Sequence, residues 1–305
     1  MIAFDLGSNT LRCVVISCDT KTIVFEDSII VKSADGIAKD GNISDEAVKR
    51  IIDGILEIGS KYNFKSGEVK AVTTEALRSA KNSKEVLETI KNKTGINFEV
   101  IDGNKEARLT LLAVKHRLKT LNIDKSFILA DIGGGSTEII FCDKDRYISK
   151  SFQLGIVTLT QKYCDLKKIE EEIRKDAQNI SGFIKENKID FKNIEVFVAT
   201  AGTPTTLAAM KLGMDYESYD SKKINGTKIT LEEIEKEFEK LVSMDEESRK
   251  KSVGVGREDL ITTGVLILKF LLITAGFDEC IAIDDGLREG VALEACDKKI
   301  YDNLP

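Results

Sequence analysis

Two glycine-rich stretches, FDLGSNTLRCVVI at residues 4–16 and ADIGGGSTEIIF at residues 130–141, decide the fold of this chain. Each is an apolar strand that leads through an aspartate into a glycine turn with hydroxyl side chains, and a second apolar strand follows. When the stretches are aligned, Asp5 falls on Asp131 and the first glycine of one turn falls on that of the other. A supersecondary unit that occurs twice indicates a duplicated domain.

A second pair of similar segments lies downstream of the first. EVKAVTTEALRSA (68–80) and IEVFVATAGTPTTLAAM (194–210) are each an apolar strand, a run with threonines and an amphipathic helix. Both halves of the chain therefore show the same order of elements. We predict two related α/β domains, at 1–120 and 121–305, with a cleft between them. We also expect the C-terminal helix, from about residue 288 to 305, to pack on the first domain.

The length of the chain agrees with two domains, and its net charge and apolar segments exclude several classes of partner. A chain of 305 residues exceeds the usual single-domain size, and its formal net charge of −6 gives no bulk basic field for nucleic acid. A local cluster of Lys and Arg can still bind a polyanion. The longest apolar stretch, 264–276, is too short to span a bilayer. The sequence predicts neither a nucleic-acid partner nor a membrane partner.

The cysteines and the single histidine limit the kinds of disulfide, catalytic site and metal site that this chain can form. The six cysteines are scattered without a CxxC pair, which is typical of reduced thiols in a cytosolic protein: Cys13, Cys18, Cys142, Cys164, Cys280 and Cys296. The chain opens on a strand rather than a signal peptide, so we expect a cytoplasmic location. His116 is the one histidine, which excludes a Ser-His-Asp triad and a multi-histidine metal site.

Helical periodicity predicts the remaining elements. We expect amphipathic helices at 105–123, with Asn104 as N-cap, and at 166–187 and 230–251, whose charge runs are solvated faces. The segment 258–275 is apolar on nearly all sides, which indicates a buried helix.

The glycine turns are typical of a phosphate cradle. Such turns expose successive backbone N–H groups, and the missing side chains let an anion approach closely. The hydroxyls of Ser8, Thr10, Ser136 and Thr137 add neutral donors. No GK[ST] follows, so this is not a Walker loop, and the turn joins two strands, unlike a dinucleotide fingerprint. The alternative is a tight hairpin in which glycine serves only the turn type. The two copies, each led by an aspartate, favour phosphate binding.

Carboxylates beside such a cradle repel a phosphate unless a cation intervenes. Asp5 and Asp131 are therefore candidate Mg²⁺ ligands, and Glu138 could hold the metal or orient a water. The alternative for Glu138 is an outward-facing strand residue. Gly202 and Thr203 lie at a strand-to-helix junction, where free N–H groups form a second anion site unless threonine simply caps the helix.

Seven motifs, in order along the chain, carry a family resemblance: DLGSNT, TEALRSAKN, IDGNKEARL, DIGGGSTE, GTPTTLAA, GREDLITTG and GLREG. Together they resemble the exopolyphosphatase / guanosine pentaphosphate phosphohydrolase family in its short two-domain form. The resemblance implies two ribonuclease H-like domains of the actin, Hsp70 and sugar kinase superfamily. It runs from residue 2 to about residue 293.

The resemblance also implies roles for individual residues. Glu106 matches the family's general base, while Asp131 and Glu138 match acids that handle metal and water. Arg288 matches a family position that we expect to be structural, paired with Glu289 or a neighbouring acid. The phosphate-binding positions that match are Ser8, Asn9, Thr10, Arg78, Gly133, Gly134, Gly135, Ser136, Thr137 and Arg257, and we add Gly202 and Thr203 from their place at the strand-to-helix junction.

The implied reaction is hydrolysis of a terminal phosphoanhydride. The substrate would be inorganic polyphosphate, guanosine pentaphosphate or both, with Mg²⁺ or Mn²⁺ as cofactor. A monovalent cation requirement and a homodimer are further expectations. Two other readings stay open: an ATP-dependent kinase of the same superfamily, and a non-catalytic nucleotide or phosphate sensor.

Overall fold

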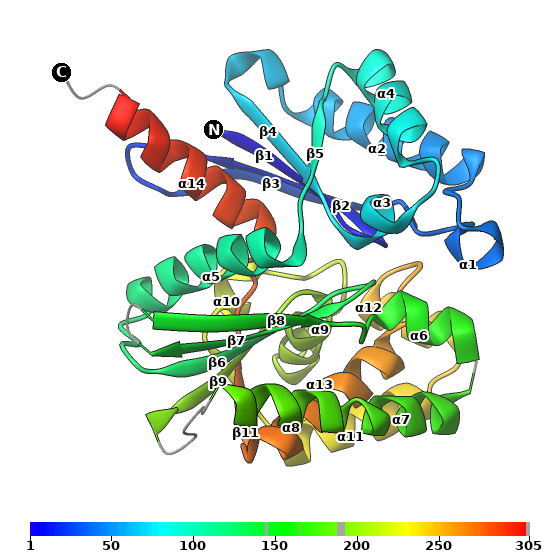
Figure 1. The fold of residues 1–305 in the computed structure, drawn as a ribbon, viewed down its shortest axis with the longest axis vertical. Helices are drawn as coiled ribbons and strands as arrows, with labels where there is room; N and C mark the ends of the chain where they lie inside the picture. Colours follow the sequence, from blue (N-terminus) through cyan, green and yellow to red (C-terminus); the bar gives the residue numbers. More distant parts are fainter. Residues whose placement is uncertain (144–145, 164, 188–192, 303–305) are drawn as a thin grey trace. The chain divides into compact units, whose positions relative to one another are not determined.

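The computed structural model describes residues 1–143, 146–163, 165–187 and 193–302. It divides into two compact units, the first formed by Met1–Ala113 with Gly286–Pro305 and the second by Val114–Asp285 (Figure 1). The division lies inside a helix, after Ala113, whereas the sequence placed it after residue 120.

The sheet of unit 1 has the strand order β3-β2-β1-β4-β5. β1 pairs antiparallel with β2 and parallel with β4, β2 pairs antiparallel with β3, and β4 pairs parallel with β5. The strands are β1 (Ile2–Leu6), β2 (Thr10–Ile16), β3 (Ile23–Ile30), β4 (Val69–Thr73) and β5 (Phe98–Val100).

The helices of unit 1 come from both ends of the chain. They are α1 (Ile37–Asp40), α2 (Asp45–Lys61), α3 (Glu75–Ser79), α4 (Ser83–Thr94), α5 (Gly103–Thr120, which runs on into unit 2) and α14 (Leu287–Asp302), with a 3-10 turn η1 (Phe64–Ser66). α14 packs on β1, β2 and β4 (Figure 1). Its Val291 shares a core with Val14, Val72 and Leu109.

A disulfide joins the two segments of unit 1. Cys18, just after β2, is bonded to Cys296 of α14. The expectation that these cysteines are reduced thiols is therefore wrong, because the fold brings residues 278 positions apart in the sequence together. Cys13, Cys142 and Cys280 are buried and are not part of a disulfide, as expected for cysteines that fill the core, and Cys164 lies outside the described residues.

Unit 2 repeats the topology of unit 1 and adds a strand. Its order is β10-β11-β9-β6-β7-β8, in which β8-β7-β6-β9-β11 matches β3-β2-β1-β4-β5 in order and in direction. The predicted duplication of a ribonuclease H-like α/β domain is thereby confirmed. The strands are β6 (Phe127–Ile132), β7 (Thr137–Asp143), β8 (Arg146–Phe152), β9 (Val196–Thr200), β10 (Thr227–Thr230) and β11 (Glu279–Ala282).

The helices of unit 2 surround one central helix. They are α6 (Ile156–Tyr163), α7 (Leu166–Lys175), α8 (Ala177–Glu186), α9 (Gly202–Lys211), α10 (Ser221–Ile224), α11 (Leu231–Ser243), α12 (Glu246–Val253) and α13 (Ile261–Ala275). α13 packs on α6, α7, α9 and α11, and most of its residues are buried, as predicted.

Two of the expected long helices are each divided in two. The segment 166–187 breaks at Asp176, between α7 and α8. The segment 230–251 breaks before Asp245, whose side chain accepts the Ser248 N–H at 2.7 Å and so starts α12. Asp245 thus ends the expected helix by capping a new one, whereas the side chain of Asp176 makes no capping hydrogen bond.

Within the described part of the chain, no helix is long and apolar enough to cross a membrane.

Candidate active site

The two glycine turns have the same hairpin geometry. The Gly7 N–H donates to the Thr10 carbonyl at 3.0 Å, and the Gly133 N–H donates to the Ser136 carbonyl at 2.9 Å. Neither of these glycines has a left-handed backbone. A Cβ on Gly133 would nevertheless lie 2.9 Å from the Ser136 carbonyl oxygen, whereas a Cβ on Gly7 would lie 3.6 Å from that of Thr10. The hairpin therefore requires glycine at position 133 but not at position 7.

Close backbone packing explains the glycines of unit 2. The N–H groups of Ile156 and Val157, at the start of α6, donate to the carbonyls of Gly133 and Gly134 at 3.0 and 2.8 Å. A Cβ on Gly155 would lie 2.3 Å from the carbonyl carbon of Gly135. The carbonyls of the glycine turn thus cap α6. Part of the reason for glycine in this turn is this close packing.

The same packing aims N–H groups at the opposite side of the turn. In a trans peptide the C=O and the following N–H point in opposite directions. Since the carbonyls of Gly133 and Gly134 point to α6, the N–H groups of Gly134 and Gly135 point away from it. This is the arrangement of an anion cradle.

The turn of unit 1 is anchored in the same way. The Ala34 N–H donates to the Ser8 carbonyl and the Val31 N–H to the Asn9 carbonyl, both at 2.9 Å. The N–H groups of Asn9 and Thr10 therefore point away from residues 31–34.

The acids of unit 2 form a cross-strand pair. Asp131 of β6 is directly opposite Glu138 of β7, so both side chains project from the same face of the sheet. Glu138 is only 1% exposed, which rules out an outward-facing strand residue. Its Oε1 accepts hydrogen bonds from the hydroxyls of Ser136 at 2.8 Å and Ser151 at 2.7 Å. Ser151 was not anticipated, because only the pairing of β8 with β7 places it opposite Glu138.

The corresponding pair in unit 1 has opposite charges. Asp5 is directly opposite Arg12, whose Nη1 lies 3.9 Å from the Asp5 carboxylate. Arg12 was not anticipated either, although its position follows once β1 and β2 are paired. The aligned positions 12 and 138 thus carry a cation in one hairpin and an anion in the other.

The carboxylates of Asp131 and Glu138 fit a hard divalent cation. Mg²⁺ takes oxygen ligands and is usually held by one or two carboxylates, with substrate oxygens and water completing the shell. No cluster of three or more His, Cys, Asp or Glu side chains suited to a metal occurs among the residues that the structure describes.

The junction between β9 and α9 forms the second candidate anion site. Ala201 has φ 74° and ψ −168°, a conformation that is essentially restricted to glycine and indicates local strain. A Cβ on Gly202 would lie 3.9 Å from Nη1 of Arg257, so this guanidinium lies beside the N-terminus of α9. The side chain of Thr203 packs against Gly264 of α13, which leaves its backbone N–H as the group that can serve an anion.

Glu106 lies in the first turn of α5, 9% exposed. The Asp102 side chain accepts the Lys105 N–H at 2.8 Å, so the helix begins earlier than expected and its N-cap is Asp102 rather than Asn104. Nη1 of Arg78 lies 3.5 Å from Oε2 of Glu106. Burial acts to lower the pKa of Arg78, but the hydrogen bond to Glu75 and the charges of Glu75 and Glu106 outweigh it and raise that pKa.

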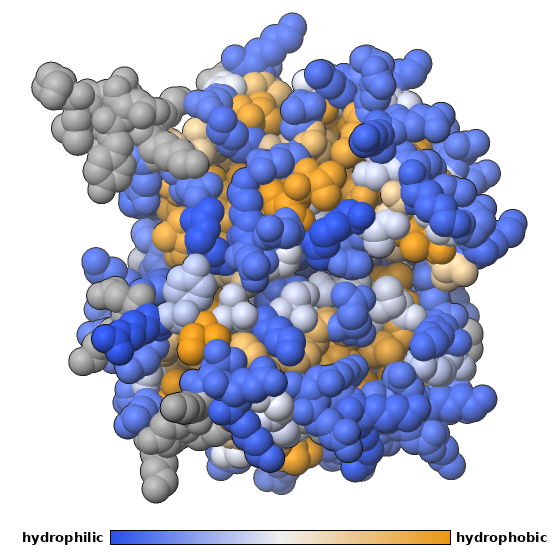
Figure 2. Space-filling model, in the orientation of Figure 1, coloured by the Kyte–Doolittle hydropathy of each residue, from blue (hydrophilic) through white to orange (hydrophobic). Residues whose placement is uncertain are grey.

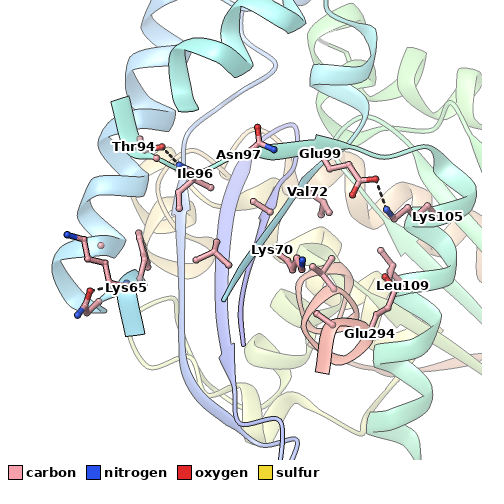
Figure 3. Close-up of a pocket in the computed structure, with 18 residues that line it drawn as sticks. Lys65, Lys70, Val72, Thr94, Ile96, Asn97, Glu99, Lys105, Leu109 and Glu294 are labelled. Atoms are coloured by element: carbon pink, nitrogen blue, oxygen red, sulfur yellow. Dashed lines mark hydrogen bonds and ion pairs between the residues drawn. The ribbon is translucent and has the colours of Figure 1, made fainter. Parts of the chain in front are cut away.

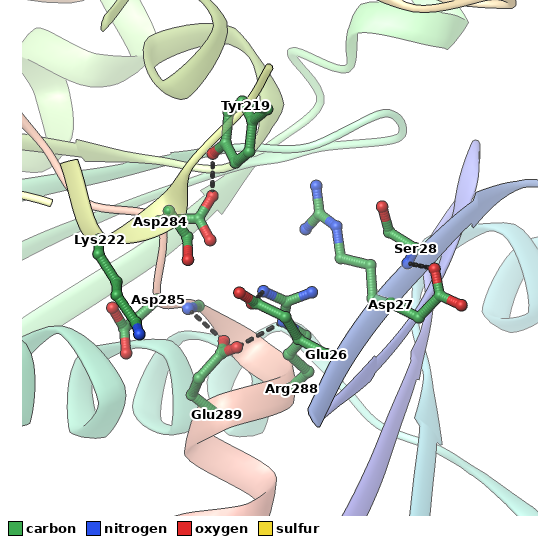
Figure 4. A network of polar contacts seen from close by, with 12 residues as sticks. Glu26, Asp27, Ser28, Tyr219, Lys222, Asp284, Asp285, Arg288 and Glu289 are labelled. Carbon is green, nitrogen blue, oxygen red and sulfur yellow. Dashed lines mark hydrogen bonds and ion pairs between the residues drawn. The ribbon is translucent and has the colours of Figure 1, made fainter. Parts of the chain in front are cut away.

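Arg288 has the structural role that was expected for it. Its Nε donates to Glu289 and its Nη2 donates to Glu26 at 2.9 Å, while Glu289 also accepts the Gly286 N–H at 2.8 Å (Figure 4). A Cβ on Gly290 would lie 2.0 Å from the Leu109 carbonyl oxygen, so this motif packs α14 tightly on α5.

The structure gathers the remaining candidates into two groups, one in each unit. Thr137 is fully buried and its hydroxyl donates to the Leu154 carbonyl at 2.5 Å, so it braces the turn. Ser8, Thr10 and Ser136 are also buried in their turns.

A cavity of about 830 Å³ opens in unit 1 away from these residues (Figure 3). It is lined by residues of η1, β4, the end of α4, β5, α5 and α14, and two of the lining residues, Lys105 and Glu99, form an ion pair at 2.6 Å. Figure 2 shows hydrophobic surface near β5, surrounded by hydrophilic residues. None of the candidate site residues lines it.

Comparison with known proteins gives a consistent result. A family model described as the Ppx/GppA phosphatase family matches residues 14–299. A bifunctional 3-dehydroquinate synthase/phosphatase of Fusobacterium nucleatum is 27% identical over 97% of this chain, which covers 46% of that protein, so the chain spans about half of its length. Exopolyphosphatase 2 of Mycobacterium tuberculosis is 24% identical over 95% of the chain and 97% of that protein.

Solved structures agree with the sequence matches. The crystal structure of the Aquifex aeolicus member of the Ppx/GppA family has a TM-score of 0.76 and 28% identity, over all of this chain and 98% of that one. An exopolyphosphatase from Cytophaga hutchinsonii has a TM-score of 0.83 at 22% identity, with 97% of each chain covered, and this likeness concerns the fold alone.

Proposed function

This chain belongs to the Ppx/GppA phosphatase family, and on that premise we propose that it hydrolyses a terminal phosphoanhydride. The substrate is inorganic polyphosphate, guanosine pentaphosphate or both, and orthophosphate is released. The observation that best supports the proposal is the pair of facing acids, Asp131 and Glu138, beside a turn whose N–H groups point away from α6. That combination suits a phosphate and its cation together.

Each group has one task in the proposed reaction. The N–H groups of the glycine turns, those at the start of α9 and the Arg257 guanidinium bind phosphate oxygens and fix the terminal phosphoryl group. Asp131 and Glu138 would hold a divalent cation, which supplies charge neutralisation for the phosphate oxygens. The hydroxyls of Ser136 and Ser151 hold the Glu138 carboxylate in place.

Glu106 acts as the general base. It takes a proton from water while the water oxygen forms a bond to the terminal phosphorus, and the bridging P–O bond breaks with its electron pair going to the leaving phosphate. The proton then passes from Glu106 to solvent.

The test is orthophosphate release with Mg²⁺ from long-chain polyphosphate and from guanosine pentaphosphate, measured in parallel. We expect wild type to release phosphate and Glu106→Ala to lose about 10²- to 10⁴-fold of that rate. Glu85→Ala is the matched control, because Glu85 is likewise the acid in the first turn of its helix, α4, but is exposed.

The ratio of the two rates identifies the preferred substrate. An absence of release from both substrates, with phosphate transfer from ATP to an acceptor, would instead show a kinase. Binding of either substrate without turnover would show a sensor. Both results would contradict the proposal.

A further inference from the structure

Glu75 holds the arginine that contacts the proposed base. Glu75 opens α3, and its Oε2 accepts hydrogen bonds from Nε of Arg78 at 3.2 Å and from Nη2 at 2.5 Å. The carboxylate therefore fixes one edge of the guanidinium within a single turn of the helix.

The opposite side of the same guanidinium faces α5. Nη1 of Arg78 donates to the Ile101 carbonyl at 2.7 Å and lies 3.5 Å from Oε2 of Glu106. Ile101 directly precedes the Asp102 cap of α5. Arg78 thus links α3 to the segment that carries Glu106, and all of these contacts lie within unit 1.

The three side chains are partly removed from solvent. Their exposed fractions are 19% for Glu75, 25% for Arg78 and 11% for Glu106, so the ion pairs are screened less than those at an open surface. Two carboxylates share one guanidinium, and the charge of Arg78 is therefore already balanced within the protein. An arginine held in this way is suited to orienting Glu106 more than to binding a substrate phosphate.

We propose that Glu75 is a positioning residue, which fixes Arg78 and through it the orientation of the Glu106 carboxylate. The inference rests on the proposed function of Glu106 as general base. Glu75 itself does not touch the substrate. Without Glu75, Arg78 keeps its Nη1 contacts and can rotate about them, so the Glu106 carboxylate no longer faces a guanidinium held in one orientation. A base displaced by about 1 Å from its productive geometry costs about 10²-fold in rate.

The first experiment separates kcat from KM. We expect Glu75→Ala to lower kcat for phosphate release by about 10- to 100-fold and to change KM by less than about twofold, because substrate binding is untouched. Glu75→Gln, which keeps the shape and one acceptor oxygen, should fall between wild type and Glu75→Ala. It also serves as the test protein if Glu75→Ala does not fold. Glu85→Ala, the exposed first-turn acid of α4, is the control and should retain wild-type kcat.

The second experiment is a double-mutant cycle with Arg78. If Glu75 acts only through Arg78, Glu75→Ala should change kcat by less than about twofold in the Arg78→Ala background. Independent, multiplicative effects of the two substitutions would overturn the inference. So would a raised KM with unchanged kcat, which would assign the pair to substrate binding.

The same assay distinguishes failure of the proposed function from failure of the proposed role of Glu75. Absence of phosphate release by wild type would refute the proposed function and this inference with it. Release by wild type that Glu106→Ala abolishes and Glu75→Ala and Glu75→Gln leave intact would refute only the role of Glu75.

Discussion

The two copies of the aspartate-led hairpin share a backbone and differ in charge. In unit 1 Asp5 faces Arg12, and in unit 2 Asp131 faces Glu138. Five strands have the same order in both units, and the same hydrogen bond closes both turns. The turn carbonyls that accept N–H groups from a later segment are those of Ser8 and Asn9 in unit 1 and those of Gly133 and Gly134 in unit 2. Duplication thus preserved the scaffold, while one cross-strand position decided whether the aspartate faces a cationic or an anionic side chain.

The two units also differ in how they are held together. Unit 1 consists of two segments from opposite ends of the chain, joined by the Cys18–Cys296 disulfide, whereas unit 2 is one continuous segment. The turn of unit 2 is packed much more closely than that of unit 1. A Cβ on Gly7 would have its nearest contact at 3.6 Å, against 2.9 Å for a Cβ on the aligned Gly133, and a Cβ on Gly155 beside the turn would lie 2.3 Å from Gly135.

The largest effect should come from removing one carboxylate of the facing pair. We expect Glu138→Gln to lower Mg²⁺-dependent phosphate release by about 10³-fold, because a cation ligand that stabilises the transition state is lost. Asp143→Asn, at the exposed end of the same strand, should retain wild-type activity. Comparable activity of Glu138→Gln and wild type would show that the charge difference between the hairpins does not affect catalysis.

Reduction of the disulfide should destabilise the discontinuous unit. We expect a dithiol reductant to lower the free energy of unfolding by about 3 kcal/mol, measured by urea denaturation with circular dichroism. Cys18→Ser should show the same loss and no further response to the reductant. Identical unfolding curves for oxidised and reduced wild type would show that the link does not support unit 1.

The glycine contacts can be compared by paired substitutions. Gly155→Ala should destabilise the protein by about 3 kcal/mol, since its Cβ would overlap the backbone of Gly135. Gly7→Ala should cost less than about 1 kcal/mol, because the nearest atom is at ordinary van der Waals distance. Equal costs in thermal unfolding would contradict the tighter packing assigned to the turn of unit 2.

The smallest of these effects concerns the hydroxyls around Glu138. Ser151→Ala should lower phosphate release by about tenfold, as expected when a group that orients a metal-binding carboxylate is lost. Ser149→Ala is the matched control, because Ser149 lies on the same face of β8 opposite Ile140 rather than an acid. Equal losses in the two variants would assign the effect to β8 itself.

Much of the fold was accessible from the sequence because its determinants are local or repeated. The aspartate-glycine hairpins and the apolar segment of α13 are patterns within a short window, and their repetition indicated the duplication. The helix breaks at Asp176 and Asp245 were missed because apolar periodicity continues across both. The N-cap of α5 was misplaced because Asp102 and Asn104 are both good caps two residues apart.

The parts of the site that were missed depend on contacts between distant positions. The roles of Arg12 and Ser151 depend on the strand register, which pairs them with Asp5 and Glu138. The link between Cys18 and Cys296 joins segments 278 residues apart, and no spacing rule connects them. The glycines were assigned to phosphate binding, although their fit against α6 is visible only once residues 155–158 are placed beside the turn.

The most direct test of the charge difference between the hairpins is Mn²⁺ binding without substrate, measured by electron paramagnetic resonance on wild type, Glu138→Gln and Asp5→Asn. The account predicts that Glu138→Gln weakens Mn²⁺ binding by at least about tenfold, while Asp5→Asn stays within about twofold of wild type. Equal weakening in both variants would show that the two hairpins share the ion, and would contradict the division of roles between Asp5–Arg12 and Asp131–Glu138.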